Sequence, residues 1–262
     1  MNLKKVTLAG IDEKVDPWDL IVLLEEFPFA EFAILFDDKK QGKENIFPGL
    51  HSDWRTNLWK VTDFYTKERK KRFPLAAHIC EYYSTRFSYD KYQDNEYEDI
   101  FGECVGHCLS FSRYLLNLDD IGCLSEYNLD KLLPEGQIIL QHISKNYNDT
   151  FIPKDVAYFN DSKNKKSKTI ISTVESRFAV SCDISNTTGF LPYRWAEADQ
   201  RIFCGYSGGL DLVDLPESLG GIDKISQSCD IWLNFQNEVR ENDWFSLEKS
   251  RRILEFLQPY IV

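Results

Sequence analysis

The chain lacks the features that mark nucleic-acid-binding, exported and membrane proteins. Its formal net charge is −11, and it has no long stretch of lysine and arginine to neutralise a phosphate backbone. No secretory signal opens it, since residues 1–5 lead into a short apolar run and then into acidic residues. That apolar run is far shorter than the roughly 20 residues that span a bilayer. We therefore expect neither a nucleic-acid partner nor export nor membrane insertion.

Histidine is scarce, and cysteine does not occur in metal-binding or disulfide patterns. The four histidines form no His-x-His pair, which argues against a metal-dependent hydrolase. The seven cysteines are odd in number and scattered, which fits reduced thiols in the cytoplasm better than a disulfide framework. Cys104, His107 and Cys108 share one face of a predicted helix, but their apolar neighbours favour an ordinary core. We predict no metal and no cofactor.

What the chain does contain is enough apolar material for one large core. Hydrophobic residues make up 43% of the 262 residues, and aromatic residues make up 14%. A barrel of eight parallel strands with surrounding helices usually needs about 250 residues. We therefore predict a single domain over residues 1–262.

Short apolar runs alternate with helical patterns along most of the chain. This alternation indicates βαβ units, and eight such strands predict an α/β fold of the (β/α)8 (TIM) barrel class. An open doubly wound sheet is the alternative, but no Gly-x-Gly-x-x-Gly turn follows the first strand. Residues 82–103 are acidic and rich in tyrosine, and we predict that they form an insertion that could act as a lid. The predicted strands are 6–11, 32–36, 75–80, 122–126, 137–142, 178–184, 201–206 and 231–235, and the main helices are 18–27, 57–71, 104–116 and 244–257.

A glycine pair follows the seventh predicted strand. Ser207, Gly208 and Gly209 come directly after it, and glycines at such a turn let backbone N–H groups approach a phosphate. Arg194 and Arg240 could add charge-assisted hydrogen bonds to the same anion. We therefore expect a small phosphorylated ligand at the carboxyl ends of the last strands.

Six short segments around the predicted strand ends form a recognisable series. They are Leu8-Ala9-Gly10-Ile11, Ala179-Val180-Ser181-Cys182-Asp183, Thr188-Gly189-Phe190, Tyr193-Arg194-Trp195, Ser207-Gly208-Gly209-Leu210 and Asn234-Phe235-Gln236-Asn237-Glu238-Val239-Arg240 with Asp243. Taken in order, these segments resemble the phosphoribosylanthranilate isomerase family. The resemblance covers both ends of the chain and is poor in the middle, where this chain carries extra residues. It implies a (β/α)8 barrel and an enzyme of tryptophan biosynthesis that performs an Amadori rearrangement on a phosphorylated sugar conjugate.

The resemblance also assigns catalytic roles, one of which this sequence does not fill. The family reaction uses an acid that protonates the ribose ring oxygen and a base that removes a proton from the neighbouring carbon. Asp183 matches the family's acid, but the position of its cysteine base is Ala9. Candidates for a displaced base are Asp12, His78 and Glu81.

The phosphate-binding part of the family pattern is also altered. The family's arginine in the loop after the second strand has no clear counterpart within residues 39–45. In the last loop, its small Ser-Gly pair is replaced by Asn237 and Glu238, which puts a carboxylate where a phosphate would lie.

Two functions stay open from these residues. The first is an isomerase-like enzyme with Asp183 as its general acid and a displaced base. The second is a catalytically inactive barrel that keeps a ligand pocket or serves as an interaction module. The sequence does not indicate the oligomeric state.

Overall fold

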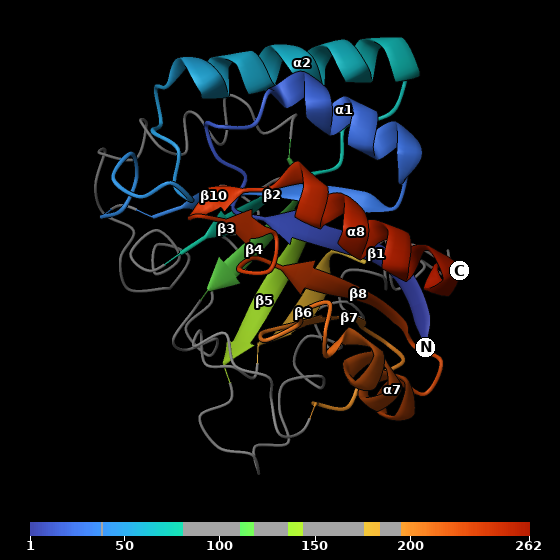
Figure 1. Ribbon diagram of the computed structural model, residues 1–262. Coiled ribbons are helices and arrows are strands. Elements are labelled where there is room, and N and C mark those ends of the chain that lie inside the picture. The colour runs from blue at the N-terminus through green and yellow to red at the C-terminus, as the bar shows by residue number, and fades with distance from the viewer. Residues whose placement is uncertain (38, 81–110, 118–135, 144–175, 184–194) are drawn as a thin grey trace, which may run out of the picture.

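The computed structural model describes residues 1–37, 39–80, 111–117, 136–143, 176–183 and 195–262. Eight parallel strands form a closed barrel in chain order, from β1 to β8, and β8 pairs with β1 to close it. Helices α1, α2, α7 and α8 lie outside the ring of strands (Figure 1). The predicted (β/α)8 barrel is therefore confirmed. The barrel strands are β1 (Asn2–Ala9), β2 (Ala30–Phe36), β3 (Leu75–Ile79), β4 (Phe111–Asn117), β5 (Gln137–Ile143), β6 (Phe178–Asp183), β7 (Phe203–Ser207) and β8 (Asp230–Phe235).

Three of the described helices begin after a residue whose side chain caps them. Asp16 accepts a hydrogen bond from the Trp18 backbone N–H at 3.0 Å, just before α1 (Pro17–Glu26). Ser52 caps α2 (Asp53–Arg69), and Ser246 caps α8 (Leu247–Leu257), in each case through its side-chain oxygen. The other elements are α7 (Leu215–Ser226), the short 3-10 helix η4 (Gln258–Tyr260) and a hairpin of β9 (Arg240–Glu241) and β10 (Trp244–Phe245). Within the described residues, every helix is too short or too polar to cross a lipid bilayer.

Two predicted elements were wrong. Residues 111–116, expected to end a helix, form most of β4, which takes the place predicted for residues 122–126. A strand buried on both faces loses the period-two pattern, and β4 is buried at five of its seven positions, so it could not be told from a helix. The helix expected from residue 244 begins at Leu247, because β9 and β10 come first. The predicted insertion at 82–103, the expected strand at 122–126 and the cluster of Cys104, His107 and Cys108 lie outside the described residues.

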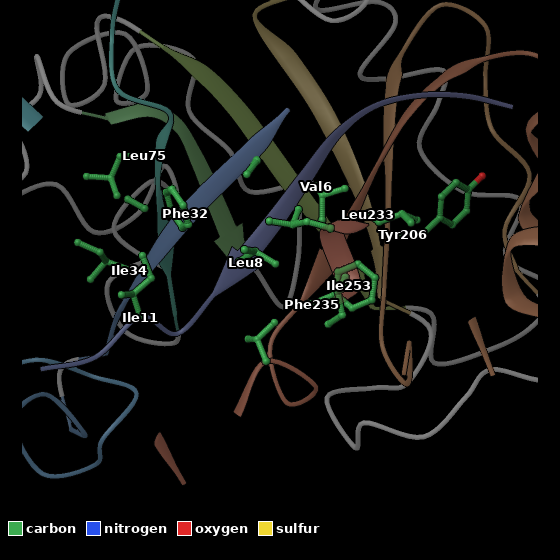
Figure 2. Packing of buried hydrophobic residues seen from close by; sticks show 14 of the residues in the cluster. Val6, Leu8, Ile11, Phe32, Ile34, Leu75, Tyr206, Leu233, Phe235 and Ile253 are labelled. Atoms are coloured by element: carbon green, nitrogen blue, oxygen red, sulfur yellow. The ribbon is translucent and has the colours of Figure 1, made fainter. Parts of the chain in front are cut away.

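The strands bury one set of side chains against the helices and the alternate set inside the barrel. Figure 2 shows part of the outer layer, with Leu8 of β1, Phe32 of β2 and Leu233 of β8 labelled. Fully burying one such aliphatic or aromatic side chain contributes about 1.5–3 kcal/mol to folding. The inner set includes two smaller apolar clusters, formed by Ala9, Ala33, Leu35, Phe47 and Ala76 and by Leu115, Ile139, Ala179, Phe203 and Trp232.

The amino-terminal half of the barrel interior holds a buried ionic network. Arg113 Nη1 lies 2.8 Å from Glu31 Oε2, and Lys5 Nζ lies 3.1 Å from Glu31 Oε1. Burial alone would raise the pKa of Glu31, but Arg113 and Lys5 outweigh it and hold the pKa at about 2. The Arg113 guanidinium also lies 4.1 Å from the centroid of the Trp232 ring. This network forms the charged layer beneath the barrel's open end.

Candidate functional site

A cavity of about 340 Å³ opens at the carboxyl ends of the strands. This is the end at which (β/α)8 barrels carry their active sites. Backbone pairing places Asp183 of β6 beside Ser207 of β7, and Ser207 beside Asn234 of β8. The polar residues around the cavity are Asp37, Lys40, His78, Cys80, Asn117, Gln141, Asp183, Ser207, Asn234, Gln236, Asn237 and Glu238.

Asp183 lines this cavity from the last position of β6. Its carboxylate is 8% exposed, and Oδ2 accepts a hydrogen bond from Gln141 Nε2 at 3.1 Å. Gln141 lies on β5, two positions before the residue that pairs with Asp183, so both side chains face the barrel interior. The amide holds the carboxylate in place while leaving it on the cavity wall. Asp183 is thus positioned to contact a ligand.

Ser207, Gly208 and Gly209 also line the cavity, as the sequence predicts. Gly208 has φ of +94° and Gly209 has φ of +66°, in the left-handed region that glycine adopts without strain. In the loop that follows, the Asp211 carboxylate binds backbone N–H groups that could otherwise bind a phosphate. Asp211 Oδ1 accepts hydrogen bonds from the N–H groups of Val213 and Asp214, at 2.7 and 2.8 Å. Two donors just before α7 are therefore already bound to a carboxylate.

Asn237 and Glu238 lie on the cavity wall after β8. Burial, together with the nearby Asp211 carboxylate, raises the pKa of Glu238, and Lys249 opposes the shift. Glu238 has no ion pair with any described residue. The acidic side chain expected from the sequence therefore reaches the cavity without a partner from the described chain.

Asp12 and Arg240 are brought together, but neither lines the cavity. Arg240 Nη2 lies 3.1 Å from Asp12 Oδ2, and Arg240 Nη1 donates to the backbone carbonyl of Gly10 at 2.7 Å. Asp12 Oδ2 also accepts from the Phe245 backbone N–H at 2.6 Å, and the Asp12 side chain is fully buried. These bonds tie the end of β1 to the β9–β10 hairpin. The pair is a structural clamp, and a base at Asp12 would first have to break it.

His78 lines the cavity from β3 and is 5% exposed. Burial lowers the pKa of His78 to about 4; the Glu31 carboxylate opposes the shift, and Arg113 adds to it. No hydrogen bond joins its ring to any described residue. His78 is thus neutral at physiological pH, with one N–H donor and one nitrogen acceptor available.

Ala9 is fully buried beside Phe47, Ala33 and Ala76 and does not line the cavity. Phe47 belongs to the segment between β2 and α2 and packs in the same cluster. The Ala9 methyl group therefore packs among apolar side chains, two of which, Leu35 and Phe47, themselves line the cavity.

Lys40 is a cavity residue that the sequence did not single out. It follows β2 in the segment where the family's arginine is missing, and its Nζ lies 5.6 Å from the centroid of the Phe47 ring. Asp37 shapes this turn, since its Oδ1 accepts from the backbone N–H groups of Lys39 and Lys40 at 2.9 and 3.1 Å. Three lysines within residues 39–43 gave no signal as to which would face the barrel.

Three amides of the cavity were also missed, namely Asn117, Gln141 and Asn234. Each lies near the carboxyl end of a barrel strand, and that position was the available signal. Asn234 Oδ1 is buried and has no hydrogen-bond partner among the described residues. Two predicted site residues, Glu81 and Arg194, lie outside the described residues.

No protein family and no curated protein matches the sequence. The resemblance to phosphoribosylanthranilate isomerase therefore rests on the motif residues alone. Of these, Asp183 and residues 207–210 and 234–238 line the cavity.

Proposed function

We propose that the open end of the barrel binds a small, hydroxyl-rich ligand of the sugar type, with little or no isomerase activity. One observation carries the proposal: Asp183, Ser207 and Asn234 lie side by side on three adjacent strands and line the same cavity. Carboxylate, hydroxyl and amide groups on one wall can bind neighbouring hydroxyls of a sugar ring. The family resemblance makes a phosphorylated sugar conjugate one ligand to test, and its phosphate would have to lie against the backbone of Gly208 and Gly209, beside the Glu238 carboxylate.

The other function, an isomerase of tryptophan biosynthesis, is favoured by the cavity position of Asp183. The isomerase reaction also needs a general base, and neither of the described candidates is well suited to that role. Asp12 is held by Arg240, and a histidine whose pKa is about 4 is a weak base near neutral pH. We therefore place ligand binding before isomerisation. Among the described residues, the buried thiols of Cys182, Cys204 and Cys229 form no disulfide, and this supports a cytoplasmic location as part of the proposal.

Calorimetric titration of the full chain with ribose and with ribose 5-phosphate tests ligand binding. Gly209→Asp is the informative variant, because Gly209 lines the cavity and its φ of +66° is one that aspartate tolerates. We expect the new carboxylate to weaken binding of both compounds by at least about tenfold, equivalent to 1.4 kcal/mol. Gly220→Asp is the matched control, because Gly220 is exposed on α7 and a Cβ there meets nothing within 4 Å.

The two variants separate the outcomes. Affinity lost in Gly209→Asp and kept in Gly220→Asp supports a site at the barrel's open end. Equal affinity in both variants and the unmodified chain would show that the sugar binds elsewhere. Glu238→Gly adds a test of the phosphate position: it should strengthen binding of ribose 5-phosphate by removing a carboxylate from the cavity wall.

A further inference from the structure

Oδ1 of Asn234 on β8 is buried and has no hydrogen-bond partner within the described residues. The imidazole of His78 on β3 is 5% exposed and faces the same cavity. Leaving a buried polar group without a hydrogen bond costs about 1–3 kcal/mol, and native proteins seldom leave one so. Both residues line the same cavity, so one ligand can bind both. Asn234 Oδ1 requires a donor, and the neutral imidazole can bind a hydroxyl both as donor and as acceptor.

Among the described residues, the charge on the cavity wall favours a cation over an anion, because Asp37, Asp183 and Glu238 contribute carboxylates and Lys40 contributes an ammonium. Lys40 Nζ also lies 4.0 Å from Glu44 Oε2, so part of its charge is already compensated. Glu238 is half-buried, and burial together with the Asp211 carboxylate raises its pKa, so a cationic partner would stabilise its charged form.

The position where a phosphate would bind is already acidic. Asp211 accepts from two backbone N–H groups before α7, and Glu238 stands on the cavity wall nearby. A phosphate beside Gly209 would therefore be repelled by the Glu238 carboxylate on the cavity wall. An ammonium in the same region would be attracted by that carboxylate, and it carries three donors for oxygen acceptors such as Asn234 Oδ1.

From these observations we infer that the ligand is a small hydroxylated primary amine of the amino-sugar class. Its ammonium binds Asn234 Oδ1 and the Glu238 carboxylate, and one of its hydroxyls binds His78. The inference rests on the proposed sugar site and names the chemical class that this site prefers. His78 is uncharged near neutral pH, since burial keeps its pKa at about 4, and so it does not repel the ammonium.

The experiment titrates the full chain with D-glucose, D-glucosamine and D-glucose 6-phosphate at slightly acidic pH, where the amine is protonated. We expect D-glucosamine to bind about tenfold or more tightly than D-glucose, because hydrogen bonds to charged groups contribute about 1.5–3 kcal/mol. D-glucose 6-phosphate should bind more weakly than D-glucose.

Variants assign the effect to residues. Glu238→Gln should abolish the preference for D-glucosamine over D-glucose. Its matched control is Glu241→Gln, at an exposed position on β9, where the preference should persist. His78→Phe should weaken D-glucosamine and D-glucose alike, and its thermal unfolding is measured alongside. If the His78→Phe variant does not fold, the Glu238→Gln result still decides whether the cavity prefers an amine.

The inference and the proposed function fail in different ways. D-glucosamine that binds no better than D-glucose, or a preference that survives in Glu238→Gln, overturns the amino-sugar inference and leaves the sugar site in place. If D-glucose 6-phosphate binds most tightly of the three compounds, the amino-sugar inference is likewise overturned and the sugar site stays in place. Absence of binding by all three compounds contradicts both.

Discussion

Arg240 binds Asp12 across 3.1 Å, and this ion pair fastens the β9–β10 hairpin to the end of β1. Sequence reasoning had assigned one residue to catalysis and the other to phosphate binding. Each is instead engaged by the other, and neither lines the cavity. The pair therefore stabilises the rim of the barrel.

Arg240→Met should destabilise the protein by about 3 kcal/mol. The substitution leaves the Asp12 carboxylate fully buried without its cation, and breaking a buried pair typically costs about this much. Urea unfolding measures the loss. Arg252→Met is the control, since Arg252 pairs with Glu248 on the exposed face of α8 and such pairs contribute about 1 kcal/mol or less. Equal stability of the two variants would contradict the clamp.

Gly205→Ala should destabilise the barrel by about 3 kcal/mol or more. A Cβ at position 205 would lie 2.1 Å from Cε2 of the buried Trp232 ring, which would have to move from beneath Arg113. Urea unfolding again provides the measurement. Gly220→Ala, in open space on α7, should instead stabilise by about 0.5–1 kcal/mol. Trp232→Phe in the Gly205→Ala background should recover part of the loss; no recovery would show that the clash lies elsewhere.

His78 should make the stability depend on pH between 6.5 and 4. Burial lowers its pKa from 6.5 to about 4, so in this range the unfolded chain binds a proton that the folded chain does not. Stability therefore falls as the pH falls through this range, by about 3 kcal/mol for this group.

The measurement compares unfolding of the wild type and His78→Gln across that pH range. The variant should lose this part of the pH dependence, whereas His51→Gln, at an exposed position, should keep it. Parallel curves for the wild type and His78→Gln would show that His78 is not buried as described.

The protein should turn over phosphoribosylanthranilate poorly, and Ala9→Cys should not restore activity. A missing general acid or base usually costs about 10²–10⁴-fold in rate. The new thiol would pack in the apolar cluster of Phe47 and Ala33, where burial disfavours the thiolate that a base requires. An isomerase assay on the wild type and the variant checks this. A clear gain of activity in Ala9→Cys would show that position 9 does reach the substrate.

The sequence predicted the barrel because most strands are short apolar runs separated by capped helices, as at Asp16 before α1. It failed at β4, where burial on both faces removes the alternation that marks a strand. The ionic network of Glu31 and Arg113 was also missed, because residues 82 positions apart give no local pattern. Long-range pairing of this kind depends on the closed ring.

In the site, as in the fold, local sequence features could be predicted and long-range contacts could not. Asp183 and the glycines after β7 were predicted because they directly follow apolar strands, at the end of the barrel where sites form. The ion pair of Asp12 was not predicted, because its partner Arg240 lies 228 positions away in the sequence. Lys40 was missed because the direction of a loop side chain depends on its turn, here fixed by Asp37.

A crystal structure of the full chain soaked in turn with ribose 5-phosphate and D-glucosamine tests the central claim most directly. We predict electron density for a sugar ring within the cavity, in contact with Asp183 and Ser207, for at least one of the two compounds. Sugar density at another surface, with the cavity empty at concentrations that saturate binding in solution, would contradict the claim.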